Sequence, residues 1–556
     1  MSERQAKRGR QFKTVKRPRV PRNKFNLSHE KRLSAEMFFL YPILLDDCIA
    51  GDFWQIANSM VLRMNPVMCP LMHEINIFTH YYFVPYRLLW EQWENFFTGG
   101  QDGKFVADMP RIDPSWFTGN IDDYFRSGSL WDYFGFNTIS GSQTYHDIVK
   151  MPLAFPLYAY NLIWNEYYRD PNIMDEVGLR DMRSPDEGIE VDGTLVGAGK
   201  NAGLRVRCWE KDYFTSMLPW QQRGEPVSIG LHGDTFADFY DSVFSLPPHS
   251  EQLETTSAVD VAQRVSFGTS EVSYGFRAGG PTYLPESIGT LRGALNKNQV
   301  SLDNVSTFDV SELRFLFQLQ RFMERSARTG SRYVEFLKGQ FNANPRDDRL
   351  QRPEYIGGSK TPLVISEVLQ TSSSDQVSPQ GNMAGHGISA DSNYISSYRV
   401  QEPGLIMGLM SIMPRTMYQQ GIDRVWLKDS KYDHYFPVFA NLSEQAVYFE
   451  ELYNFAPDLV DRVIGYQGRY DEYRFKRNTV HGMFRDEFEY WQLARKFSSA
   501  PTLNADLVAP NEAERFAMKR PLASHVDPMF LISFGNKCHV TRPMPFMAEP
   551  GLIDHN

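Results

Sequence analysis

Residues 72–100 carry the clearest pattern of polar and apolar positions in the chain. Polar and apolar side chains alternate from His73 to His80, which is the period of a β-strand. The strand-forming residues 81–84 follow, and aromatic and β-branched side chains favour strands. Pro85 then ends the run, because proline has no N–H to donate to a sheet ladder. We predict a buried strand over these positions.

The period changes from two to 3.6 directly after this proline. One apolar face of a short helix is formed by Leu89, Trp93, Phe96 and Phe97. Gly99 and Gly100 end this helix, since glycine adopts the left-handed backbone of a helix C-terminus at little cost. We interpret residues 72–100 as a strand, a corner and an aromatic-faced helix, with Trp90 and Trp93 in core or neighbour contacts.

Short strands are also predicted on both sides of this stretch. From Phe25 onward the chain shows strand-like runs that are broken by Pro42 and by the turn residues 50–52. The later predicted segments are a strand at 363–369, a Ser/Gly-rich loop at 371–397 and a strand at 404–413.

Helical patterns are few. Asp309 and Glu312 form a capping-box-like pair at the start of one helix. A largely apolar stripe follows, made of Leu313, Leu316, Phe317, Gln320 and Met323. The aromatic stretch 158–170 fits a second short helix only in part. Many short strands, few helices and no repeat predict an all-β sandwich with helical excursions.

The length of the chain requires more than one simple core. At 556 residues it exceeds the ~250–300 at which single cores stop growing, so it holds two domains or one domain with large insertions. In residues 226–306, 25 of 81 positions are Gly, Ser or Thr and none is Trp. Such a weak core predicts an inserted surface region, the alternative being a long disordered loop.

Charge divides the chain into a basic arm, residues 1–24, and an acidic body. The arm has Glu3 as its one acidic residue, and the body holds 48 basic and 66 acidic residues. The basic residues of the arm are Arg4, Lys7, Arg8, Arg10, Lys13, Lys16, Arg17, Arg19, Arg22 and Lys24. This asymmetry predicts a tether to nucleic acid or to another anionic surface, and on nucleic acid the arm would neutralise phosphates. A solvated tail or a localisation signal remains the alternative.

Aromatic and cysteine usage add two expectations. The 39 Phe, 28 Tyr and 10 Trp suggest extensive protein interfaces as well as a core. The four cysteines are far apart and form no CxxC pair, so we expect free thiols in a reducing compartment. The longest apolar run, 404–413, is shorter than the ~20 residues of a membrane helix, and no apolar segment follows the basic N-terminus. We expect a soluble intracellular protein.

No motif for catalysis or metal binding has the spacing that its chemistry needs. His73-Glu74 and His80 lack the HExxH spacing, and opposite faces of a strand cannot share a metal. Residues 197–200 (GAGK) lack the first Gly and the Ser/Thr of a phosphate loop, so we interpret them as a polar turn. Carboxylates such as Asp46-Asp47 cannot be paired from sequence. We predict no active site, no metal and no cofactor.

The strongest binding candidate is the segment 461–497, in which cations alternate with aromatic residues. The predicted nucleic-acid contacts in it are Arg469, Tyr470, Tyr473, Arg474, Lys476 and Arg477. A cation beside a flat ring suits single-stranded nucleic acid, because it neutralises phosphate and offers a stacking face. The alternative is that Asp461, Asp471, Glu472 and Asp486 pair these cations at a subunit interface.

Along nearly its whole length, the sequence resembles the major capsid protein of microviruses, specifically the gokushovirus branch. The matching blocks are FNLSHE (25–30), 70–100, YNLIWNEYYRD (160–170), KDYFTSMLPWQQRG (211–224), 312–335, RPEYIGG (352–358), GNMAGHG (381–387), PRTMYQQGIDR (414–424) and PGLIDHN (550–556). Several long matches in one order make this more specific than a single motif.

The resemblance implies an eight-stranded antiparallel jelly roll with enlarged inter-strand loops. Its two parts would be residues 25–225 and 307–556, with 226–306 inserted as a surface protrusion at the three-fold axes. It further implies a T=1 icosahedral shell around circular single-stranded DNA, assembled through pentamers in the bacterial cytoplasm. The implied partners are a small basic internal DNA-binding protein, a scaffolding protein, a pilot protein and a host surface receptor, without membrane insertion.

Two other functions were weighed against a shell protein. A polysaccharide-processing enzyme on a β-sandwich lacks support because we find no catalytic constellation. A cellular nucleic-acid-binding protein with a basic arm does not need so long an aromatic-rich body. A self-assembling capsid protein with a host-attachment protrusion is therefore the leading hypothesis.

Overall fold

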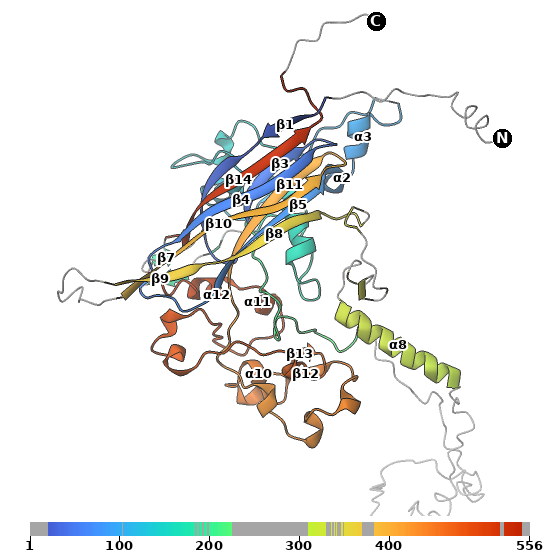
Figure 1. The fold of residues 1–556 in the computed structure, drawn as a ribbon, viewed down its shortest axis with the longest axis vertical. Coiled ribbons are helices and arrows are strands. Elements are labelled where there is room, and N and C mark those ends of the chain that lie inside the picture. Colours follow the sequence, from blue (N-terminus) through green and yellow to red (C-terminus); the bar gives the residue numbers. More distant parts are fainter. Residues whose placement is uncertain are drawn as a thin grey trace, which may run out of the picture. The chain divides into compact units, whose positions relative to one another are not determined.

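Two antiparallel sheets form the centre of the computed structural model (Figure 1). The structure describes residues 21–102, 104–183, 186–187, 189–191, 194–196, 199–224, 310–329, 335, 338–339, 341, 346–348, 350–369, 383–522 and 527–547. The chain divides into two compact units, one of residues 1–223 with 324–556 and one of residues 224–323. The predicted insertion, 226–306, lies outside the described residues.

The larger sheet has six strands in the order β1-β14-β4-β10-β9, and β2 also pairs with β14. Its strands are β1 (Asn23–Asn26), β2 (His29–Ala35), β4 (Phe53–Met64), β9 (Val364–Leu369), β10 (Met383–Arg399) and β14 (Phe530–Arg542). Buried and more exposed positions alternate along β4 and β14. This alternation is expected for strands with one face on the core and one toward solvent.

The smaller sheet has four strands in the order β3-β11-β5-β8. Its strands are β3 (Tyr41–Cys48), β5 (Ile75–Pro85), β8 (Glu354–Pro362) and β11 (Gly404–Pro414). β11 is buried at every position, because it lies between the larger sheet and the helical layer. The prediction of a sheet-rich sandwich of antiparallel strands is thus confirmed.

The predicted strand before Pro85 is β5, and both of its faces are buried. Toward the larger sheet, Thr79 and Tyr81 each accept a hydrogen bond from Asn58 of β4, at 3.3 Å. On the other face, His80 and Tyr82 meet the hydroxyl of Tyr168, at 2.7 and 3.2 Å. β5 is therefore an interior strand between the larger sheet and the helices.

The single helix predicted after Pro85 is wrong, because the segment forms α2 (Tyr86–Leu89) and α3 (Trp93–Thr98). Trp90 between them is extended, with φ −147° and ψ 115°. The ring centroids of Trp90 and Trp93 lie 6.4 and 6.1 Å from the ring centroid of Phe155. Packing of both tryptophans against Phe155 thus outweighs the helical spacing of the apolar residues, and the chain breaks at Trp90. The predicted glycine end is confirmed, since Gly99 has φ +82°.

Two predicted strand breaks had different outcomes. The turn at 50–52 is confirmed, with Gly51 at φ +97°. The break at Pro42 is wrong, because Pro42 lies inside β3. β3 is an edge strand, and its ladder with β11 shifts register at Gly408/Leu409, opposite Pro42. An edge strand tolerates a proline that cannot donate.

The predicted loop 371–397 is wrong for residues 383–397, which belong to β10; residues 370–382 lie outside the described residues. β10 pairs with β4 from Ile388 to Arg399 and with β9 at its start. Pairing with one neighbour or the other along nearly its whole length outweighs the low strand propensity of its Ser and Gly residues. The predicted strands at 363–369 and 404–413 are confirmed as β9 and β11.

The helical predictions are also confirmed. α8 (Val310–Thr329) is the predicted helix, and its predicted cap, Asp309, lies outside the described residues. α5 (Phe155–Ile163) continues as the π-helix η4 (Trp164–Tyr168). The remaining α-helices and strands are α4 (Leu130–Tyr133), α10 (Phe449–Leu452), α11 (Ala505–Val508), α12 (Glu512–Ala517), β6 (Ile189–Val191), β7 (Thr194–Val196), β12 (Gln445–Tyr448) and β13 (Val463–Gln467).

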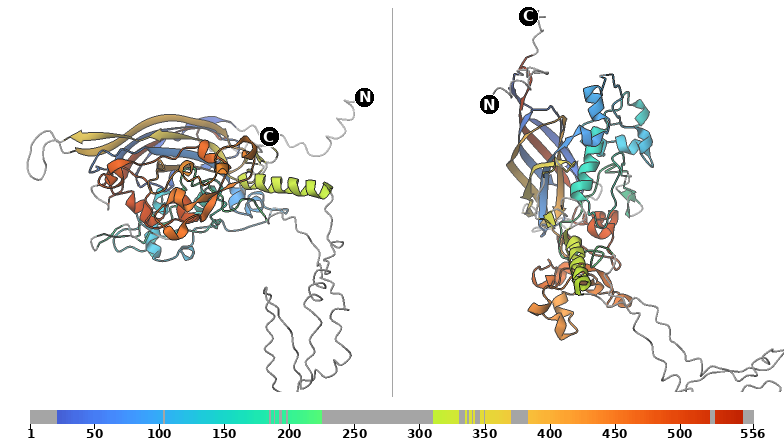
Figure 2. Two further views of the ribbon diagram at one scale, coloured as in Figure 1. Left: turned by 90° about the horizontal axis from the view of Figure 1, so that it is seen from below. Right: turned by 90° about the vertical axis from the view of Figure 1, so that its right-hand side faces the viewer.

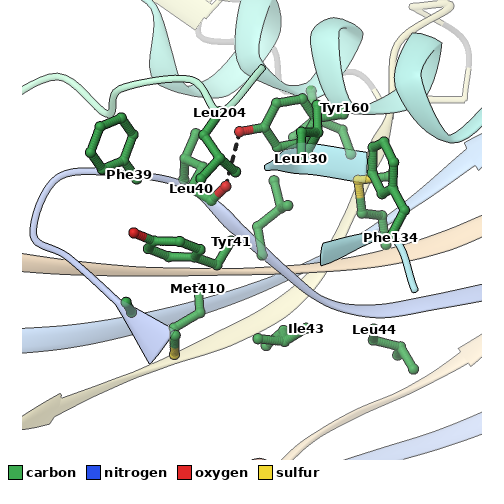
Figure 3. Packing of buried hydrophobic residues seen from close by; sticks show 14 of the residues in the cluster. Phe39, Leu40, Tyr41, Ile43, Leu44, Leu130, Phe134, Tyr160, Leu204 and Met410 are labelled. Carbon is green, nitrogen blue, oxygen red and sulfur yellow. Dashed lines mark hydrogen bonds between the residues drawn. The ribbon is translucent and has the colours of Figure 1, made fainter. Parts of the chain in front are cut away.

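The main core joins the two sheets to the helices of residues 112–168. Figure 2 shows these helices on one side of the stacked sheets. Figure 3 shows how Tyr160 of α5 donates a hydrogen bond to the carbonyl of Leu40, at 2.9 Å. The same hydroxyl accepts from the N–H of Arg205, at 2.8 Å. A second, smaller core forms around Phe214, Tyr418 and Val447 beside β12 and β13.

Candidate nucleic-acid interface

The segment 461–497 wraps the smaller core as β13 and a series of short turns. Four of its six predicted contacts come together around the turn η10 (Asp471–Tyr473). The guanidinium of Arg469 lies 4.6 Å from the ring centroid of Tyr470, and the rings of Tyr470 and Tyr473 are 6.2 Å apart. Arg474 follows directly as the C-cap of the turn. The cation–ring interleaving seen in the sequence is thus a real cluster.

Tyr470 is the structural centre of this cluster. Its side chain is 2% exposed, and its hydroxyl donates to the carbonyl of His434 at 3.0 Å. Its N–H donates to Oε1 of Gln445, at 3.3 Å, from a left-handed backbone with φ +65°. The ring therefore has no free face for a nucleobase, and it supports the residues around it.

The cations of the segment differ in how far contacts within the chain already occupy them. Arg477 donates to the carbonyls of Glu451 and Gly421, at 2.5 and 3.0 Å, and burial lowers its pKa. Arg474 pairs with Asp471 at 2.5 Å, so the expected carboxylate pairing occurs within one chain. Lys476 lies 3.5 Å from Asp423 but keeps 70% of its side chain exposed. Arg477 is structural, whereas Lys476 can reach a partner.

Tyr473 provides the accessible ring of the cluster. It is 47% exposed, and Lys428 both donates to its hydroxyl and lies 4.8 Å from its ring centroid. The adjacent Phe475 is 60% exposed. Sequence reasoning missed Lys428, because it lies 45 positions away on another loop and carries no local signal. A cation beside an exposed ring can bind phosphate and stack a base.

The basic arm is described only at its end. Arg22 and Lys24 are exposed, and the eight basic residues from Arg4 to Arg19 lie outside the described residues. Lys24 belongs to β1, where it pairs with Thr541 of β14. The arm thus leaves the larger sheet at its β1 edge.

The two histidines without a metal-binding spacing, His73 and His80, are part of the packed interior. His73 is buried, and burial lowers its pKa to about 4. Burial also lowers the pKa of His80 to about 4, and its Nδ1 accepts from the hydroxyl of Tyr168. In the described part of the chain, no three His, Cys, Asp or Glu side chains are placed to hold a metal ion. Both histidines are neutral parts of the packing.

The carboxylates Asp46 and Asp47 and the turn at 197–200 complete the candidates from the sequence. Asp47 accepts a hydrogen bond from the hydroxyl of Tyr86 at 2.5 Å, while burial raises the pKa of Asp46. Gly199 and Lys200 lie in a turn, and Gly197 and Ala198 lie outside the described residues. Among the described helices, none is long and apolar enough to cross a membrane.

Comparison with known proteins gives the family. The family model described as "Capsid protein (F protein)" matches residues 13–552. "Capsid protein VP1" of Chlamydia phage 1 is 31% identical, with 97% of each chain covered. "Capsid protein VP1" of Bdellovibrio phage phiMH2K is 30% identical over 90% of each chain, and that of Spiroplasma virus 4 is 27% identical over 97% of each.

These relatives confirm the resemblance to the gokushovirus branch of the microviruses. The matched range includes both sheets and the cluster around Tyr470. The family is one of structural proteins, and this excludes the alternative of a polysaccharide-processing enzyme on a β-sandwich. The chain therefore belongs to the capsid protein (F protein) family and is a major capsid protein of a small phage.

Proposed function

We propose that copies of this chain assemble through pentamers into a small T=1 icosahedral shell that encloses circular single-stranded DNA. Assembly takes place in the bacterial cytoplasm. The observation that carries the proposal is the similarity to phage capsid proteins over 97% of the chain. The exposed aromatic residues of the range 426–455 support it, because such residues anchor protein interfaces.

The proposed fold is an eight-stranded jelly roll. Numbered in chain order, the strands β2, β3, β4, β5, β8, β10, β11 and β14 give sheets of order 1-8-3-6 and 2-7-4-5. The first and last strands are neighbours, and each sheet takes strands from both halves of the chain. This order supports the jelly roll, in which two Greek keys share two sheets. β1 extends the β2 side, and β9 adds an edge strand.

The proposed genome contacts are of two kinds. The arm, residues 1–24, neutralises phosphates without reading sequence. The exposed part of the η10 cluster, Tyr473 with Lys428, Arg474 and Lys476, offers stacking and charge. Arg469, Tyr470 and Arg477 hold the shape of this surface through their contacts within the chain.

The remaining proposed partners follow from the family resemblance. They are a small basic internal DNA-binding protein, a scaffolding protein, a pilot protein and a host surface receptor. Residues 226–306 form the proposed three-fold protrusion that meets the receptor. Deleting these residues should abolish adsorption of assembled particles to host cells, and adsorption at the original rate would refute a receptor role.

Assembly itself is tested by expressing the full chain with its phage partners. Sedimentation and negative-stain microscopy should show pentamers and closed shells, and nuclease-resistant single-stranded DNA should be recovered from the shells. A chain that stays monomeric and cleaves glycans would overturn the proposal.

A further inference from the structure

The larger sheet presents one face to solvent, and this face is basic although the body is acidic. Residues 25–556 hold 48 basic and 66 acidic residues. On the exposed face of β1, β2, β4, β10 and β14, Glu30 is the one carboxylate. The cations on this face are Lys24, Arg32, Arg63, Arg399 and Lys537. The sign of the charge is thus reversed locally.

No carboxylate of the described residues forms an ion pair with these cations. Among the described residues, no ion pair involves Arg32, Arg63 or Arg399. Lys537 donates only a 3.4 Å hydrogen bond, to the hydroxyl of Ser392. Cations that a protein exposes without partners in an otherwise acidic body raise the local concentration of a polyanion.

The middle of the face carries an exposed aromatic ring, Tyr394, beside small residues. Tyr394 and Lys537 pair with Ala57 from opposite sides. Strands lie ~4.8 Å apart, so the Cα atoms of Tyr394 and Lys537 are roughly 10 Å apart, with the small residue Ala57 between them. Tyr394 is 67% exposed. The neighbouring position is also small, Ser59 opposite Ser392.

The face is continuous with the arm. β1 lies at the edge of this sheet, beside β14 (Figure 1). Lys24, the last of the ten basic residues of the arm, belongs to β1. The helices of residues 112–168 belong to the core on the side of the smaller sheet. Nothing in the described part of the chain covers the face, as the exposure of Arg63, Tyr394 and Lys537 shows.

We infer that this exposed face, on β4, β10 and β14, is a genome-contacting wall of the shell that binds the phosphates of packaged single-stranded DNA, with Tyr394 stacking a base. The inference rests on the proposed packaging of DNA and assigns a surface to it. The site is separate from the η10 cluster in sequence and in fold. Binding is independent of base sequence, because backbone phosphates and ring stacking carry it.

The first test measures binding of the purified full chain to a polythymidine strand over a range of salt concentrations. The variant Arg63→Gln with Lys537→Gln removes two phosphate contacts. Each contact with a single strand contributes about 0.7 to the slope of log K against log salt. We expect the slope to fall by about 1.4, while the matched control Lys104→Gln with Lys150→Gln, at exposed lysines outside the sheet, leaves it unchanged. Equal slopes in the two variants would overturn the inference.

The second test needs no substitution. Ultraviolet crosslinking of intact DNA-filled particles, followed by mass spectrometry, should identify nucleotide adducts on β10 peptides that contain Tyr394. Filled particles whose adducts lie only on the arm or on other segments, with none on the exposed face of β4, β10 or β14, would overturn the inference and leave the packaging function standing. Particles without single-stranded DNA would instead refute the proposed function.

Discussion

His73 and Leu493 are joined by a hydrogen bond between positions 420 residues apart. The Leu493 N–H donates to Nδ1 of His73 at 3.2 Å, and Nε2 on the other side of the ring donates to the carbonyl of Arg415 at 2.7 Å. These two bonds fix the neutral tautomer, because Nδ1 must keep its lone pair. His73 thereby connects the start of the β5 segment to the loops of the smaller core.

Protonation of His73 should destabilise the fold. Its pKa is about 4 against an ordinary ~6.5, so the native state binds fewer protons than the unfolded state. The free energy of unfolding should fall as the pH falls from about 6.5 to 4, by up to about 3 kcal/mol from this residue. His80 contributes in the same direction.

Urea unfolding of the unassembled chain at pH 7 and pH 5 measures this effect. His73→Leu should be less stable than the original chain at pH 7, and the difference should narrow at pH 5. His146→Gln, at an exposed position, is the matched control and should follow the original chain. An unchanged difference at the two pH values would show that His73 does not titrate.

Glu514 neutralises a fully buried cation. Nε and Nη2 of Arg495 bind its two carboxylate oxygens at 2.7 and 3.2 Å, and Nη1 donates to the carbonyl of Leu507 at 2.9 Å. The Arg495 side chain has 0% exposure. Glu514→Ala should cost about 3–5 kcal/mol of unfolding free energy, because it leaves the guanidinium buried and unpaired. Glu487→Ala, at an exposed carboxylate, should change thermal unfolding little.

Two neighbouring tyrosines should separate binding from stability. Tyr473→Ala removes an exposed ring and should weaken binding to single-stranded DNA by about 1–3 kcal/mol for each stacked base. Its melting temperature should stay near the original value. Tyr470→Ala empties a buried site and should lose about 3–5 kcal/mol of stability. Normal DNA affinity in Tyr473→Ala, measured by fluorescence anisotropy, would exclude this ring from the interface.

The arm should act by its charge alone. Deleting residues 2–22 stops before Asn23, so the pairing of β1 with β14 is preserved. The shells should still form, but they should retain less DNA and lose it at lower salt, because the phosphate contacts of the arm are absent. Exchanging every arm lysine for arginine keeps the charge and is the control. Unchanged packaging after the deletion, measured by nuclease protection, would refute the role of the arm.

Parts of this protein were readable from the sequence because their signals are local. The strand pattern at 73–84, the apolar run at 404–413 and the helical stripe at 313–323 all became elements. The basic arm and the family blocks were equally visible. Each of these features depends on neighbours within a few positions, so side-chain period and charge are sufficient to indicate it.

The tertiary structure decided what depends on partners far along the chain. β10 is a strand because β9 pairs with its first part and β4 with the rest, which outweighs its Ser-rich composition. Tyr470 looked like a base-stacking residue, yet the carbonyl of His434 and the side chain of Gln445 hold it inside. The basic face exists only because β14, from the C-terminal end, lies between β4 and the N-terminal strands. Sequence determines the period and charge of each segment, whereas long-range pairing and burial determine which side chains remain free to bind.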